Sequence, residues 1–333
     1  MKTTDYRRDF PLLMQETAAY LDNAATAQRP QCVLDAEKIS GMEELLKFVF
    51  LLAFVGFGTK AAVFPMYAWL PAASVAPTPV TALLHAVAVV NAGAYAVLRV
   101  IYYSFGASFL YGTWAQTVAL LLSCFTILFG STMAVREQHF KRRLAYSTIS
   151  NLSYMLMGAA LMTPDGMAGS LSHLVIHGVI KITLFYCAGA ILIKTGKEYV
   201  QDLRGYSRIM PATCGIFLLG SIALVGTPPL AGFVSKWNLL TAASATGLPM
   251  GTVAIVCLII SAILTAIYLF TAALPMYFRP LNADQAQLAG QKLDPSWMML
   301  LPMGILCALM IGLGLWSQPL VTFLRNISAG VIF

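Results

Sequence analysis

The sequence predicts an all-α fold, a polytopic bundle of membrane-spanning helices. Of its 333 residues, 59% are hydrophobic and only 11% are charged, whereas an ordinary soluble domain carries about 25% charged residues. The hydrophobic residues also gather in runs long enough to cross the hydrocarbon core of a bilayer. A chain with so little polar surface takes the lipid bilayer as its solvent, so we expect a multi-pass protein of the plasma membrane.

About eight apolar runs are candidate spans. They lie at residues 47–69, 79–103, 114–135, 143–162, 167–194, 211–243, 249–278 and 297–320. The run at 211–243 is too long for one crossing and contains Pro228 and Pro229, followed by Gly232. Proline lacks a backbone donor and clashes with the preceding turn, so this helix is expected to break near 226–232. Backbone broken at that depth must face protein or a water-filled cavity.

Basic residues between the runs predict the orientation. If the spans cross alternately, one side collects the basic residues of loops 136–143, 194–210 and 279–296, while the other has only Arg99 and Arg325 outside the N-terminal tail. Lysine and arginine accumulate in cytoplasmic loops, so these three loops are predicted to be cytoplasmic and the C-terminus external. The same alternation places the basic N-terminal tail outside, which conflicts with this rule. The net charge of +7 is scattered over the loops, so no nucleic-acid partner is expected.

Cysteine and histidine spacing predicts neither a metal site nor a cofactor. His173 and His177 are four residues apart, which would suit zinc, but their face offers no carboxylate or thiolate as a third ligand, and Lys181 would repel a cation. No cysteine pair has the CxxC spacing of a metal or redox site, and the apolar runs contain Cys124, Cys187, Cys214, Cys257 and Cys307. We therefore expect no metal, no cofactor and no catalysis by this chain alone.

Three lysines lie well inside the apolar runs: Lys60, Lys181 and Lys236. A lysine at the centre of a bilayer costs about 2.5–3.5 kcal/mol or more, and every acidic residue lies outside the runs or at their ends. The alternative is that a long side chain reaches the interface, which fits Lys47 and Lys194 at the ends of runs. For the three inner lysines, the cost favours a role in moving ions or protons.

Three histidines also fall inside the runs: His85, His173 and His177. His173, His177 and Lys181 follow one another at intervals of four residues, so they project from one helix face. They would form a polar row about 12 Å long. With water molecules between its members, such a row can hold and pass protons. The alternative is that each histidine is simply hydrogen-bonded to a neighbouring helix.

A short internal repeat links two of the lysines. Residues 56–60 (GFGTK) and 232–236 (GFVSK) share the pattern G-F-x-[S/T]-K at a separation of 176 residues. Prolines lie beside both lysines, Pro65 near the first and Pro228 and Pro229 near the second. Matching interrupted segments in two halves of a membrane protein indicate a transport site.

At these residues the sequence resembles a known family, the antiporter-like subunits of respiratory complex I, membrane-bound hydrogenases and Mrp-type sodium/proton antiporters. The resemblance covers about 45–333 and favours the Mrp-D-like branch. The segments that carry it are 56–99 (GFGTKAAVFPMYAWLPAASVAPTPVTALLHAVAVVNAGAYAVLR), 141–151 (KRRLAYSTISN), 173–181 (HLVIHGVIK) and 226–237 (GTPPLAGFVSKW). It implies a subunit that translocates protons, or a cation such as sodium against protons. Its partners would be sister membrane subunits of an antiporter, an NADH-quinone oxidoreductase-like complex or a hydrogenase.

The resemblance also implies a fold of fourteen helices with two inverted five-helix repeats, each holding a lysine on a broken helix. Here it implies one complete five-helix unit at about 114–278 and remnants of the other, because the family's first six helices are not matched. Lys60 is then expected to lack the glutamate that pairs with it in the family. By this resemblance, the groups that translocate protons are Lys60, His85, His173, His177, Lys181 and Lys236.

Residues 1–37 resemble a different protein, the N-terminus of a cysteine desulfurase. The segments concerned are Asp9–Pro11 and Tyr20–Pro30. In that family the lysine that binds pyridoxal phosphate and the catalytic cysteine lie far downstream, where this chain has already entered the membrane, so no desulfurase activity is expected. The expected organisation is a polar tail at 1–45 without a fold of its own and a transmembrane domain at 46–333. The alternative function is an inactive truncated or fused membrane fragment.

Overall fold

The computed structural model describes residues 42–86, 88–247, 249–282 and 290–330. Within these residues the chain is helical and contains no strand, apart from one isolated bridge between His139 and Tyr199. The predicted all-α fold is therefore confirmed. The segment that resembles a cysteine desulfurase lies outside the described residues.

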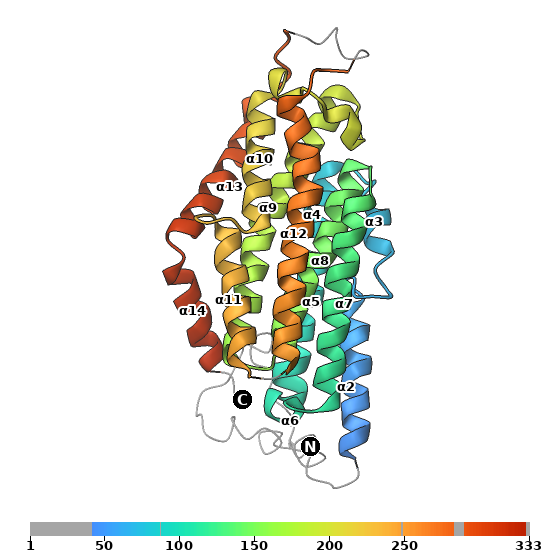
Figure 1. The fold of residues 1–333 in the computed structure, drawn as a ribbon, viewed down its shortest axis with the longest axis vertical. Helices are drawn as coiled ribbons and strands as arrows, with labels where there is room; N and C mark the ends of the chain where they lie inside the picture. Colours follow the sequence, from blue (N-terminus) through green and yellow to red (C-terminus); the bar gives the residue numbers. More distant parts are fainter. Residues whose placement is uncertain (1–41, 87, 248, 283–289, 331–333) are drawn as a thin grey trace, which may run out of the picture.

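The helices pass back and forth along the long axis of one elongated bundle (Figure 1). In order, the passes are α2 (Glu43–Gly58) with α3 (Trp69–Ala73), α4 (Thr78–Ala86) with α5 (Val89–Arg99), α7 (Trp114–Arg136), α8 (Phe140–Ala160), α9 (Pro164–Thr195), α10 (Pro211–Val225) with α11 (Ala231–Ala245), α12 (Pro249–Phe278), and α13 (Trp297–Leu315) with α14 (Gln318–Ala329). Shorter pieces connect them: η3 (Val100–Phe105), α6 (Ala107–Leu110), η4 (Val200–Leu203) and η5 (Tyr206–Arg208). Each predicted run corresponds to one pass.

Five of these segments are by themselves long and apolar enough to cross a membrane: Thr78–Phe105, Trp114–Arg136, Pro164–Thr195, Pro249–Phe278 and Trp297–Leu315. The other three predicted spans differ for separate physical reasons. Helix α2 has only 16 residues, α8 is rich in serine and other polar residues, and the span at 211–243 is divided into two helices of 15 residues each.

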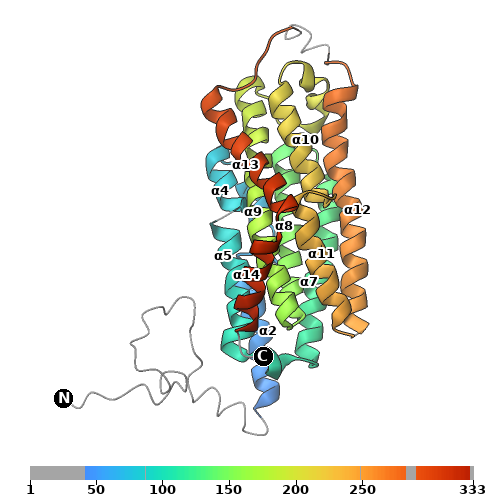
Figure 2. The ribbon, with the colours of Figure 1, turned by 90° about the vertical axis from the view of Figure 1, so that its left-hand side faces the viewer.

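Helix α9 is the central helix of the bundle. It contacts α4, α8, α10, α11, α13 and α14, and Figures 1 and 2 show it enclosed by them. Two glycines let α4 approach closely: a Cβ on Gly178 would lie 3.1 Å from Ala86 O, and one on Gly189 would collide with Thr78. The start of α9 is capped by Thr163, whose side chain accepts a hydrogen bond from Gly166 N at 3.1 Å.

The predicted break in the sixth span is present between α10 and α11. Helix α10 ends at Gly226, which has a left-handed φ of 95°, a conformation that favours glycine at helix ends. Helix α11 then begins at Ala231. The two halves are in close contact, because a Cβ added to Gly232 would collide with Ala223 O. The broken helix is therefore a compact joint.

The two G-F-x-[S/T]-K segments differ in local structure. Lys60 lies just beyond the end of α2, in turns that lead to Pro65, whereas Lys236 lies inside α11. The order of lysine and proline accounts for this difference. Pro228 and Pro229 precede Lys236, so a new helix can form after them, while Pro65 follows Lys60 and the chain has already left the helix. The repeat in sequence is thus not a repeat of local conformation.

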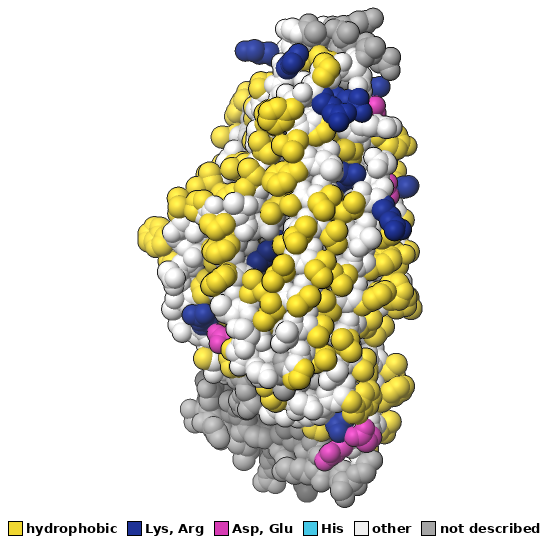
Figure 3. All heavy atoms as spheres, viewed as in Figure 1, with side chains coloured by type: hydrophobic (Ala, Val, Ile, Leu, Met, Phe, Trp, Pro, Cys, Tyr) yellow, Lys and Arg dark blue, Asp and Glu magenta, His cyan; other side chains and the backbone are white. Residues whose placement is uncertain are grey.

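Charge is distributed unevenly over the surface. Figure 3 shows hydrophobic side chains over most of the visible face, with lysine and arginine gathered toward the end where α12 finishes and α10 begins. The three basic loops predicted to be cytoplasmic connect helices at that end. Helix α2 begins, and α14 ends, near the opposite end (Figure 1). This distribution fits the predicted alternation of the passes.

We predict that Gly232→Ala destabilises the protein although it introduces a better helix former. The added methyl group meets Ala223 O across the joint, and overpacking of this kind costs about 1–3 kcal/mol. The matched control is Gly312→Ala in α13, where an added Cβ meets nothing within 4 Å. Thermal unfolding in detergent should show a lower melting temperature for Gly232→Ala only, and equal melting temperatures would contradict the close joint.

Candidate functional site

The predicted polar row on α9 faces the interior of the bundle. His177 and Lys181 are completely buried and His173 is 2% exposed. The rings of His173 and His177 are 5.9 Å apart between centroids and nearly parallel, at 24°. The three side chains therefore share one interior face, as their spacing predicts, and none of them is turned toward lipid.

Lys181 is held by helix α8. Its Nζ donates to Leu144 O at 2.9 Å and to the hydroxyl of Ser147. That hydroxyl in turn donates to Leu144 O at 2.8 Å. Among the described residues no carboxylate pairs with Lys181, so neutral oxygen atoms of α8 are its acceptors.

Lys236 is held by the broken helix itself. Its side chain reaches back from α11 and Nζ donates to Leu224 O at 2.8 Å and Val225 O at 2.9 Å. These are carbonyls of the last turn of α10, which have no partner within their own helix. The C-terminal end of a helix also carries partial negative charge. On its other side, Nζ lies 5.4 Å from the centroid of the Tyr154 ring, within range of a cation–π interaction.

The hydrogen bonds offset much of the cost of burying these lysines without acids. Placing a lysine at this depth costs about 2.5–3.5 kcal/mol, and a hydrogen bond to a charged group contributes about 1.5–3 kcal/mol. Two such bonds at each ammonium offset a cost of this size. Neutral backbone and hydroxyl oxygen atoms thus take the place of acidic residues as partners of the two lysines.

His173 connects the row on α9 to the broken helix. Its Nδ1 lies 2.9 Å from Ser235 Oγ, one residue before Lys236. Its ring also meets the ring of Tyr154 edge-on at 5.4 Å, and it interacts electrostatically with Lys236. The two ends of the candidate site are thus continuous through His173.

His85 joins the same site from α4. It is completely buried and its ring stacks on Phe185 of α9 at 4.8 Å. It lies close enough to Lys181 for their positive charges to repel each other, and His177 is similarly close to Lys181, His173 and His85. Within the described part of the chain, both ring nitrogens of His85 and His177 and Nε2 of His173 have no hydrogen-bond partner. These nitrogens are available to accept or donate a proton through water.

Lys60 lies apart from the other predicted residues. It is exposed, and it forms no ion pair with any described residue. Its backbone is packed tightly, because a Cβ on Gly93 would lie 2.6 Å from Lys60 Cβ and 2.7 Å from Ala61 N. The structure therefore brings five of the six predicted residues together and leaves Lys60 outside their cluster.

A cluster of buried hydroxyl groups beside the site was not predicted. Tyr154 donates to Ser261 Oγ at 2.7 Å. Ser261 Oγ lies 2.5 Å from Ser131 Oγ, and Ser131 donates to Ser150 Oγ at 3.0 Å. These groups come from α7, α8 and α12, so the cluster extends the polar interior away from Lys236 toward α12.

A sequence signal for this cluster exists. Polar residues of α8 recur with the i, i+3, i+4, i+7 spacing of one helix face: Ser147, Ser150, Asn151 and Tyr154. On α12, three polar residues recur with a similar spacing: Ser261, Thr265 and Tyr268. All seven are fully buried. Two polar faces in neighbouring spans indicate that the spans face each other.

We predict that a short exposure to an amine-reactive reagent modifies Lys60 and spares Lys181 and Lys236. Lys60 is exposed, whereas the other two are buried and hydrogen-bonded. Peptide mass spectrometry of the protein in detergent measures the extent of labelling, with exposed Lys194 as the positive control. Labelling of Lys181 as fast as Lys194 would show that the row opens to water.

Comparison with known proteins places this geometry in a family. The sequence matches the family described as NADH:quinone oxidoreductase/Mrp antiporter, TM, over residues 33–265. Subunit N of NADH-quinone oxidoreductase from Desulforudis audaxviator is 32% identical over 289 residues, which cover 84% of this chain and 56% of that protein. Subunit L from Mycobacterium tuberculosis is 35% identical over 237 residues, covering 70% of this chain and 36% of that protein. The chain therefore spans about half or less of the length of these relatives.

Solved structures share the fold. A chain of the Mrp complex from Dietzia sp. DQ12-45-1b superposes with a TM-score of 0.75 at 22% identity, over 90% of this chain and 65% of that chain. A chain of the archaeal membrane-bound sulfane sulfur reductase gives 0.77 at 24% identity, over 91% of this chain and 61% of that chain. The family match extends over most of the described helices, including α9 and α11. The chain thus belongs to the NADH:quinone oxidoreductase/Mrp antiporter membrane family.

Proposed function

We propose that this chain is a membrane subunit that translocates protons, or a cation such as sodium against protons, within a multisubunit complex. One observation carries the proposal: two lysines and three histidines lie buried in one continuous cluster, and no described acid neutralises them. Buried ionisable residues in membrane spans face functional pathways as a rule. A purely structural bundle has no need of this cluster, because apolar side chains would fill the same space at lower cost.

The proposed path runs between Lys181 and Lys236 along α9. Lys181 exchanges a proton with His177, His177 with His173, and His173 with Lys236, while His85 offers a side branch from α4. Both ring nitrogens of His177 and Nε2 of His173 lack a hydrogen-bond partner among the described residues, so we propose that water molecules bridge the steps of the path. Neutral histidine has one donor and one acceptor nitrogen, which suits it to both receive and pass a proton.

The partners are proposed from the same family relationship. The chain works beside sister antiporter-like membrane subunits, in an antiporter, a respiratory complex or a hydrogenase of the plasma membrane. Within the family, the signature residues favour the Mrp-D-like branch. For residues 1–37 we propose no desulfurase activity, because the lysine and cysteine of that chemistry lie beyond the resembling segment in that family.

We predict that Lys181→Ala and Lys236→Ala each reduce proton movement to below about one-hundredth of the wild-type rate, because removing a proton carrier typically costs 10²-fold or more. Dye-monitored proton uptake into vesicles measures the effect. The control is Lys197→Ala, whose side chain lies in the loop after α9 and outside the cluster, and which should leave the rate unchanged. The wild-type signal must first exceed that of empty vesicles. No wild-type signal would favour the alternative of an inactive membrane fragment, and full activity of Lys236→Ala would remove that lysine from the path.

We further predict that Tyr154→Phe slows proton movement about twofold to tenfold without stopping it. The ring below Lys236 remains, but the hydrogen bond to Ser261 is lost, and such a bond contributes about 0.5–1.5 kcal/mol. Tyr95→Phe, the same change at an exposed tyrosine, is the control in the vesicle assay. An unchanged rate in Tyr154→Phe would show that the hydroxyl cluster only supports the fold.

A further inference from the structure

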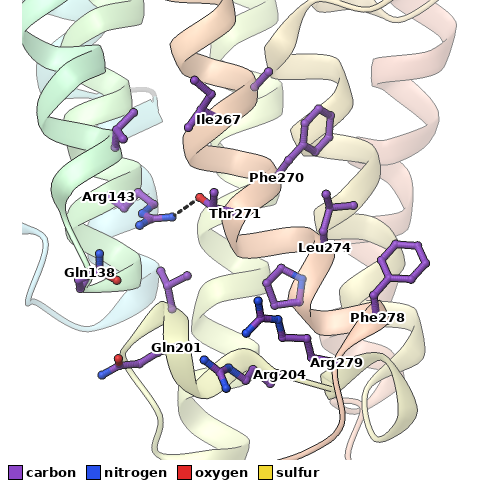
Figure 4. A pocket seen from close by; sticks show the side chains of 14 residues that line it. Gln138, Arg143, Gln201, Arg204, Ile267, Phe270, Thr271, Leu274, Phe278 and Arg279 are labelled. Atoms are coloured by element: carbon purple, nitrogen blue, oxygen red, sulfur yellow. Dashed lines mark hydrogen bonds between the residues drawn. The ribbon is translucent and has the colours of Figure 1, made fainter.

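A second polar feature lies at the basic end of the bundle, away from the lysine and histidine cluster. A groove of about 760 Å³ opens between the start of α8, the segment around η4 and the end of α12 (Figure 4). Three arginines line it: Arg143, Arg204 and Arg279. The described residues that line the groove include no aspartate or glutamate. The groove is therefore a concentrated positive site in a part of the surface that borders the membrane.

The three arginines differ in burial and in hydrogen bonding. Arg143 is buried and its guanidinium donates to Glu137 O at 2.8 Å, Tyr268 O at 3.0 Å and Thr271 Oγ1 at 3.0 Å, so it forms a fixed wall. The side chains of Arg204 and Arg279 form no hydrogen bond or ion pair with the described residues, and Figure 4 shows both at the same rim of the groove. Two arginines are thus available for an anion, beside a third that is held in place.

The part of the groove nearer the middle of the bundle is apolar and continues onto the outer face of α12. The lining residues on this helix include Ile267, Leu274 and Phe278, spaced seven and four residues apart and therefore on one face. All are exposed, Phe278 by 82%. The same face continues along the helix through further exposed residues, Val256, Ile260 and Ile263. A positive rim therefore joins a long apolar surface.

We propose that this groove binds an anionic phospholipid. The phosphate group lies between Arg204 and Arg279, and the acyl chains follow the exposed face of α12 toward the middle of the membrane. Arginine binds phosphate through paired donors, and basic pockets between transmembrane helices on the cytoplasmic side recognise anionic headgroups. The groove lies at the end of the bundle that the basic loops predict to be cytoplasmic.

The apolar face distinguishes a lipid from other occupants. A free phosphate or soluble phosphoester would use the arginines but leave the face of α12 exposed. A helix of a neighbouring subunit would cover α12 but would leave the arginines without an anion unless it carried acids. A phospholipid uses both parts of the surface, the arginines through its phosphate and the face of α12 through its acyl chains.

The test measures lipid binding to the full chain, purified in mild detergent and stripped of lipid, by native mass spectrometry. Dioleoyl phosphatidylglycerol and dioleoyl phosphatidylcholine carry the same acyl chains and differ in headgroup charge. The wild-type protein should bind phosphatidylglycerol more tightly and gain thermal stability from it. In Arg204→Gln/Arg279→Gln the preference should fall about tenfold or more, because each basic residue contributes about 1 kcal/mol at a charged membrane surface.

The matched control is Lys194→Gln/Lys197→Gln, which removes the same charge at the same end of the bundle but outside the groove. It should keep the preference, and Arg204→Lys/Arg279→Lys should keep most of it. If the wild-type protein bound both lipids equally, that result alone would overturn the proposal. If the lysine control lost the preference for phosphatidylglycerol to the same extent, the preference would come from the overall positive charge of this end and the proposal would be wrong. If glycerol 3-phosphate bound as tightly as phosphatidylglycerol, the groove would be an anion site that does not bind lipid.

Discussion

A helix that breaks inside the membrane leaves backbone carbonyl oxygens without donors, and the site in this protein is built on the way two of them are satisfied. Lys236 reaches back across the joint and donates to Leu224 O and Val225 O. Lipid supplies no such donor, so the break needs the lysine. The lysine equally needs the break, because no described acid pairs with it. The cation and the interrupted backbone therefore stabilise each other.

The remaining groups are positioned by an unbroken helix. Helix α9 runs through the middle of the bundle without interruption over 32 residues, so the spacing of four residues places its polar side chains on one line. The small surfaces of Gly178 and Gly189 bring α4 close, which places His85 against α9. On the other side, the polar faces of α8 and α12 turn toward each other because neither can face lipid. The continuous helices that pack around the joint between α10 and α11 thus form the polar interior.

The spacing of His173, His177 and Lys181 was sufficient to predict their common face, and Pro228 with Pro229 was sufficient to predict the broken helix. Both depend on local geometry, which sequence determines directly. The acceptors of Lys181 and the contact between His173 and Ser235 depend on how one helix is rotated against another, which a single sequence does not specify. Lys60 and Lys236 differ in local structure because the nearby prolines lie on opposite sides of the two lysines. The shared pattern G-F-x-[S/T]-K does not include these prolines and so did not predict the difference.

The close joint between α10 and α11 makes the environment of Lys236 depend on the relative position of the two helices. Nζ of Lys236 and its two acceptors belong to different helical halves, so a sliding of α11 relative to α10 lengthens both hydrogen bonds at once. Such a displacement would remove the two hydrogen bonds that stabilise the ammonium group. Conversely, the two hydrogen bonds hold the end of α10 against α11. The contact between the two halves and the environment of Lys236 are therefore linked, and Gly232 permits the two halves to touch.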